Sequence, residues 1–149
     1  LAASYKEICL RVCGAREMQI EGLAVNIAPL SLDTEVEELS RFHIGLMPLP
    51  DDPWTRGKGG YKLLQYMSMG LPVVSSPVGI NCRIVKHGHN GFLAADEDEW
   101  RQYLGQLIEN PRLRQEMGKR GREIVEREYS LETSSSKLSQ NMRETAYRT

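Results

Sequence analysis

The sequence lacks the cysteine pairing, the long apolar runs and the charge excess that mark several common classes of protein. Its three cysteines are an odd number without paired spacing, which argues against a disulfide framework and fits a reducing cytoplasm. No apolar run approaches the roughly 18 residues that span a bilayer, and we expect no secretory leader. The net charge is -1, so no overall field favours nucleic acid or a membrane surface.

Short apolar strands alternate with amphipathic helices along the 149 residues. We expect strands at 8–13, 24–28, 43–49, 72–76 and 92–94, and helices at 35–42, 60–69, 80–86, 97–109, from 111 past 125, and at 131–145. This alternation predicts an α/β fold, with a Rossmann-like parallel sheet flanked by helices. Ligands of such sheets bind at the carboxyl ends of the strands, so the loops after Cys13, Leu49 and Ser75 form the candidate rim.

Several local signals predict where elements begin. Thr34 followed by Glu37 has the spacing of a helix capping box. Asn110, with a proline after it, predicts the start of a long helix. Ser130 is the expected cap of a last helix, whose serine-rich middle has disorder as its alternative. The segment 50–56, with two prolines and two aspartates, is expected to be a loop.

The most informative segment is rich in glycine and enters a helix directly. Such a turn leaves backbone N–H groups free beside the positive end of the helix dipole, and glycine lets a phosphate approach closely. Lys58 and Lys62 add cationic donors, which together predict a diphosphate cradle. The alternative is a flexible loop with solvated lysines. The segment reads Gly57-Lys58-Gly59-Gly60, and the buried helix stripe after it is Gly60, Leu63, Leu64 and Met67.

The run from Gly60 to Gly79 resembles the signature of retaining GT-B glycosyltransferases of family 4, also called group 1. That signature is a glycine turn, a helix ending in a Met-Ala-x-Gly type sequence, and then Pro-Val-Val. A later match is His87-Gly88-x-Asn90-Gly91-Phe92-Leu93, and weaker matches lie at 44–48 and 129–132. The resemblance covers nearly the whole chain, which makes it stronger than any single motif.

The resemblance implies that the chain is the donor-binding half of a two-domain enzyme. The donor would be a nucleotide sugar such as a UDP- or GDP-hexose, bound without a metal or cofactor. The residues implied in donor binding are Gly57, Lys58, Gly59, Gly60, Tyr61, Lys62, Leu63, Gln65 and Gly79. In this interpretation the glycine amides and the lysines stabilise the departing diphosphate, and Gln65 holds the ribose.

Two positions depart from the family pattern, which has glutamates where this chain has Gly57 and Gln65. The first usually lies near the donor sugar, and Gly57 can contribute only its backbone there. The second typically holds the ribose, and an amide can still hydrogen-bond a hydroxyl. We read these changes as a subfamily variant and name no catalytic residue.

The expected domain organisation is a partial carboxy-terminal domain over residues 1–149, because 1–5 resemble the tail of a helix whose beginning is missing. The acceptor-binding amino-terminal domain and the first strand of this domain would then be absent, and the chain alone would not turn over. The full protein is expected to transfer a hexose with retention to a glycan or lipid-linked acceptor. We expect it in the cytoplasm, with peripheral attachment to the inner face of the membrane left open, and with no nucleic-acid partner.

Other interpretations stay open at this point. The chain could be a nucleotide-sugar epimerase or a phosphorylase on the same fold, or a non-catalytic binding module. Arg56 could contact a phosphate or lie on the surface, and Trp54 could stack on a base or pin its loop by burial. His87 and His89 are interpreted as surface residues, because no metal-binding constellation accompanies them.

Overall fold

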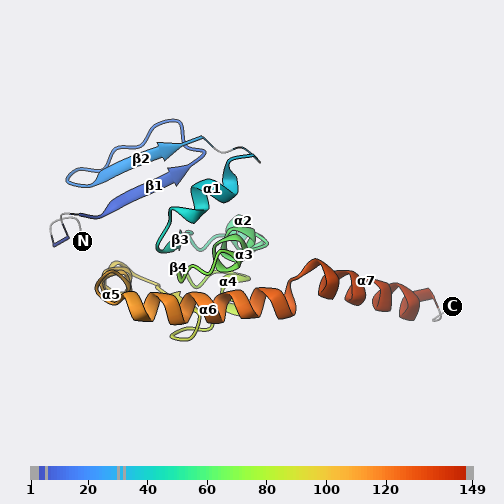
Figure 1. Cartoon of the computed structure of the whole chain (residues 1–149). Coiled ribbons are helices and arrows are strands. Elements are labelled where there is room, and N and C mark those ends of the chain that lie inside the picture. Colours follow the sequence, from blue (N-terminus) through green and yellow to red (C-terminus); the bar gives the residue numbers. More distant parts are fainter. Residues whose placement is uncertain (1–3, 6, 30, 32, 147–149) are drawn as a thin grey trace.

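The computed structural model describes residues 4–5, 7–29, 31 and 33–146, and Figure 1 shows the arrangement of its elements. The sequence analysis expects residues 1–5 to form the tail of a helix, and residues 1–3 of that segment lie outside the described range. The strands are β1 Cys9–Cys13, β2 Ala24–Ala28, β3 Gly45–Met47, β4 Val73–Ser75 and β5 Gly91–Leu93. The helices are α1 Glu35–Ser40, α2 Pro53–Arg56, α3 Tyr61–Ser68, α4 Asn81–Ile84, α5 Glu97–Glu109, α6 Pro111–Glu128 and α7 Leu131–Ala146.

Every strand pair in the described residues is parallel, which confirms the predicted α/β class. The strands divide between two sheets, however, with β1 beside β2 and the order β3-β4-β5 in the second sheet. In Figure 1, α1 descends from the β1–β2 sheet toward β3. α1 thus connects β2 of the first sheet to β3 of the second, two strands that do not pair with each other.

The core lies where α3 packs between the second sheet and α6. Leu63 and Met67 of α3 are completely buried, as the predicted stripe requires, together with Val73 of β4. On the α6 side, a Cβ atom on Gly118 would lie only 1.8 Å from the carbonyl oxygen of Gly70. Gly70 ends α3 with φ at +71°, as expected of a helix-terminating glycine. The two backbones therefore touch without an intervening side chain.

A buried asparagine holds the loop that connects α4 to β5. The Asn90 side chain is completely buried, and its amide donates to the carbonyl oxygen of Ile84 at 3.1 Å. Its Oδ1 accepts from the backbone N–H of Lys86 at 2.7 Å, so both ends of the amide are satisfied. Asn90 of the His-Gly-x-Asn-Gly motif thus has a structural role.

Two predictions about the segment before the glycine turn are wrong. Thr34 makes no side-chain cap, because its hydroxyl hydrogen-bonds Ser31 Oγ at 2.8 Å, so the predicted capping box is absent. The expected loop 50–56 contains α2, which Asp52 and Thr55 cap reciprocally. The Asp52 carboxylate accepts from the Thr55 N–H at 2.8 Å, and the Thr55 hydroxyl accepts from the Asp52 N–H at 3.2 Å. An aspartate before a proline is a start signal for a helix, so this one was readable in the sequence.

The carboxy-terminal helices follow the sequence prediction closely. Asn110 caps α6 by accepting from the Leu113 N–H at 3.0 Å. Ser130 accepts from the Thr133 N–H at 3.2 Å at the start of α7, which is helical through its serine-rich part, so the disordered alternative is wrong. Figure 1 shows α7 continuing beyond α6 and away from the sheets. Among the residues that the structure describes, no helix combines the length and apolar composition that a membrane span requires.

We predict opposite outcomes for two glycines inside helices. Gly118→Ala would force its methyl group into the Gly70 carbonyl, so we expect the unfolding free energy to fall by about 1–3 kcal/mol. Gly105→Ala meets only the hydroxyl end of Tyr5 at 3.3 Å, so the higher helix propensity of alanine should leave stability unchanged or raise it by up to ~1 kcal/mol. Urea denaturation measures both, and equal effects would contradict the close backbone contact.

Candidate functional site

The glycine segment that the sequence singles out connects α2 to α3, and its first half is engaged. The backbone N–H of Gly57 donates to the carbonyl oxygen of Trp54 at 3.2 Å, and that of Lys58 donates to Thr55 at 3.1 Å. These two amides close the end of α2. The predicted contributions of Gly57 and Lys58 to a ligand therefore cannot come from their N–H groups in this conformation.

The second half of the segment presents free amides. Within the described part of the chain, no acceptor is found for the N–H groups of Gly59, Gly60, Tyr61 and Lys62. The first amide of α3 with an acceptor is that of Leu63, which donates to Gly60 O at 3.0 Å. Since the first turn of a helix carries partial positive charge, these four amides form an anion-attracting end.

The two glycines at this end differ in exposure. Gly59 is exposed, and a Cβ atom there would have no neighbour within 4 Å. Gly60 is buried and left-handed with φ at +67°, and a Cβ atom on it would lie 2.5 Å from Ile84 Cδ1 and 2.9 Å from Ile80 Cγ2. Only glycine fits at position 60, where the chain bends over α4 into α3. The open approach to the amides is at Gly59.

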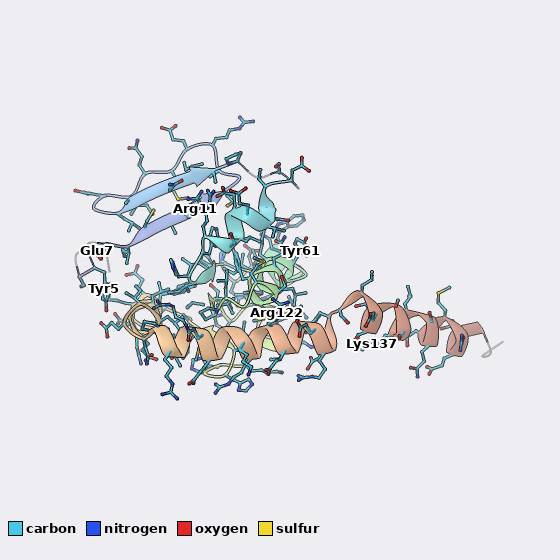
Figure 2. All side chains as sticks on the ribbon, in the orientation of Figure 1. Tyr5, Glu7, Arg11, Tyr61, Arg122 and Lys137 are labelled. Carbon is cyan, nitrogen blue, oxygen red and sulfur yellow. The ribbon has the colours of Figure 1, made fainter. Side chains whose placement is uncertain are left out.

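The structure brings Gly79 to the same rim. Gly79 is exposed with φ at +54°, and a Cβ atom on it would lie 2.6 Å from the carbonyl oxygen of Arg56. The turn after β4 therefore packs against the end of α2, beside the glycine segment. Tyr61 is 65% exposed at the start of α3, where Figure 2 labels it. Leu63 is completely buried, so its predicted place in donor binding offers no side-chain contact.

The two predicted cations are in different situations. Lys58 is exposed, and no ion pair of its side chain is found in the described residues. The Lys62 ammonium lies 3.3 Å from Glu35 Oε1, across the interface between α3 and α1. Lys62 is thus committed to a carboxylate that the sequence analysis did not single out.

Gln65, the predicted ribose contact, lies next to the same carboxylate. A hydrogen bond from the Gln65 side chain, with support from Lys62, lowers the pKa of Glu35 below its usual range. The Gln65 Oε1 atom is buried and has no hydrogen-bond partner among the described residues. A sequence search could not have found Glu35, because 27 residues separate it from Lys62 and only the fold joins them.

The remaining candidates have local partners. Arg56 binds Asp51 through two hydrogen bonds of 2.6 and 3.0 Å, which lowers the pKa of Asp51. Trp54 is 81% exposed, so the alternative that it pins its loop by burial is wrong. His87 Nδ1 accepts from the Leu93 N–H at 3.2 Å, and its ring packs edge-on against Tyr103. Among the described residues there is no group of three or more His, Cys, Asp or Glu that could hold a metal.

A hollow of about 410 Å³ lies at the turn between α5 and α6, and none of the predicted site residues lines it. The lining side chains are Gln106, Glu109, Asn110 and Leu113.

Residues 53–124 match the family model described as glycosyl transferases group 1. The chain is also similar in fold to sucrose-phosphate synthase from Thermosynechococcus elongatus, with a TM-score of 0.72 and 20% identity over 84% of this chain. The Anabaena protein HepE in complex with UDP gives a TM-score of 0.64 and 17% identity over 80% of this chain. No curated protein matches.

A third similar structure is the carboxy-terminal domain of LpcC, a glycosyl transferase group 1 family protein from Francisella tularensis. Its TM-score is 0.60, with 18% identity over 74% of this chain. The chain spans 31% of the sucrose-phosphate synthase, 32% of HepE and 56% of the LpcC domain. The matched family segment contains α2, the glycine turn, α3, Gly79 and most of α6.

We predict that Glu35 makes the stability of the fold depend on pH. Because its pKa is lowered from the ordinary 4.5, the ionised carboxylate stabilises the folded state above that pH. This contribution is lost as the pH falls through the lower folded-state pKa, and Glu35→Gln lacks it throughout. The stability difference between the two proteins should therefore be largest at neutral pH and shrink as the pH falls below 4.5.

Urea denaturation over this pH range is the measurement, with Glu97→Gln as the control. Glu97 is also the first residue of a helix, and it is exposed. A difference between wild type and Glu35→Gln that stays constant with pH would contradict the assignment.

Proposed function

We propose that this chain, which matches the group 1 glycosyl transferase family model over residues 53–124, is the nucleotide-sugar-binding part of a GT-B glycosyltransferase. The observation that carries the proposal is the set of four unpartnered amides, Gly59 to Lys62, at an exposed end of α3 inside the matched segment. Free amides at a helix N-terminus bind phosphate groups by hydrogen bonds and by the helix dipole. A nucleoside diphosphate is the ligand that this arrangement suits.

In the proposed reaction the donor's diphosphate becomes the leaving group. Negative charge develops on it as its bond to the sugar breaks, and fixed N–H groups stabilise that charge without reorganising. The exposed Lys58 side chain and the neighbouring Gly79 backbone would complete the contacts. The sugar would be a hexose, transferred with retention to a glycan or lipid-linked acceptor, and no metal or cofactor is invoked.

The comparisons support the donor class. HepE was solved with UDP and with UDP-glucose, and its fold is similar to that of this chain. Since the chain spans about a third of HepE, we propose that an amino-terminal acceptor domain completes the cleft. We further propose that the enzyme that includes this chain is cytoplasmic. If its acceptor is lipid-linked, the enzyme would attach peripherally to the membrane.

We predict that the chain binds UDP or GDP more tightly than the parent nucleoside, because only the diphosphate reaches the α3 amides. Lys58→Ala should weaken binding of the diphosphate about two- to fivefold, the effect of one exposed charge pair. The loss should shrink at higher ionic strength, since salt screens exposed charges. Isothermal titration calorimetry with each nucleotide measures these effects.

The matched control is Lys119→Ala, which removes an exposed lysine of α6 that pairs with Glu123 at 4.0 Å. Its affinity for the nucleotide should equal that of the wild type. A wild-type chain without affinity for UDP or GDP would favour the non-catalytic module over the donor-binding function.

A further inference from the structure

A small polar cluster, formed by Glu35, Lys62 and Gln65, adjoins the free amides at the start of α3. Lys62 and Gln65 are three residues apart and share one face of α3, and both contact the carboxylate of Glu35. We call these three residues the Glu35 cluster. It joins α3 to α1, and the proposed function gives it no task.

The position of Glu35 is fixed from the side of the first sheet. Glu38, one turn further along α1, accepts a hydrogen bond of 2.7 Å from Arg11 Nε on β1. Figure 2 shows Arg11 between β1 and α1. The Glu38 side chain is only 12% exposed, so this pair attaches α1 to the sheet through a largely desolvated contact. The pair of Arg11 and Glu38 therefore holds α1 against the first sheet, while residues of α3 contact the Glu35 side chain.

Gln65 has no acceptor and at most one N–H donor left for a ribose. An amide can donate to a carboxylate only through its NH₂ group, which Gln65 uses on Glu35. Its Oε1 atom is buried and cannot be reached. The acceptor capacity at this point of the surface belongs to the carboxylate that Gln65 holds.

Glu35 itself retains acceptor capacity. A carboxylate offers about four lone-pair sites, and Lys62 and Gln65 occupy two of them. Its side chain is 18% exposed, so solvent or a ligand can reach it. Lys62 neutralises the carboxylate, which removes the repulsion that a bare anion would exert on a nearby diphosphate. Neutral hydroxyl donors are the partners that such a carboxylate accepts.

We propose that Glu35 reads the ribose of the donor nucleotide, with its carboxylate accepting hydrogen bonds from the ribose hydroxyls. This inference rests on the proposed function, because the ribose is next to the diphosphate in the ligand and the Glu35 cluster is next to the free amides of α3. Carboxylates recognise ribose hydroxyls in this way in dinucleotide-binding folds. Lys62 is then the counter-ion of Glu35, and Gln65 is the residue that orients it.

The test compares UDP with 2′-deoxy-UDP by calorimetry, or the guanine pair if GDP is the tighter ligand. The wild type should prefer the ribonucleotide about tenfold, the value of one hydrogen bond to a charged group. Glu35→Ala should lower the affinity for UDP more than the affinity for 2′-deoxy-UDP, so that the preference for the ribonucleotide disappears. Glu35→Asp keeps the carboxylate and should restore part of the preference.

The control variant is Glu37→Ala, which removes an exposed carboxylate of the same helix that pairs with Arg41 at 2.6 Å. It should keep the wild-type preference, and thermal unfolding confirms that each variant is folded. Equal weakening of both nucleotides by Glu35→Ala, or a wild type that binds both equally, overturns the ribose assignment and leaves the donor function standing. A wild type that binds no nucleotide at all overturns both.

Discussion

The packing of α3 determines what the rest of the surface can do. Leu63 and Met67 are completely buried between β4 and α6, which fixes the rotation of the helix about its axis. Lys62 and Gln65 must then point away from that core, toward α1, and the first turn of the helix must face the end of α2. A buried apolar stripe thus sets the direction of polar groups that it never touches.

The free amides depend in turn on a single backbone conformation. Gly60 takes the left-handed region at a position where Ile80 and Ile84 leave no room for a side chain. This bend turns the chain into α3 within the four residues that follow α2, and the amides of residues 59–62 find no acceptor behind them. The glycines of the segment have separate tasks, since Gly60 makes the bend and Gly59 leaves the approach open.

Much of this arrangement was predictable from local patterns. The stripe of α3, the glycine that ends it and the Asn110 cap are short-range signals, and the structure confirms each of them. The capping box predicted at Thr34 is absent because the Thr34 hydroxyl bonds to Ser31 instead. Glu35 could not be predicted, because its contacts with α3 arise only after α1 packs across the sheets. The sequence predicts the elements well, whereas pairings between distant elements depend on the tertiary fold.

The contact between Gly118 and Gly70 has a mechanical consequence. With backbone against backbone at Gly70, the carboxy-terminal end of α3 cannot move toward α6 at this point without atomic overlap. On its other side α3 meets α1 through the long side chains of Lys62 and Glu35, which can change rotamer. Any adjustment of the molecule around a ligand would therefore displace α1 and the first sheet, while α3 stays in place as a rigid reference.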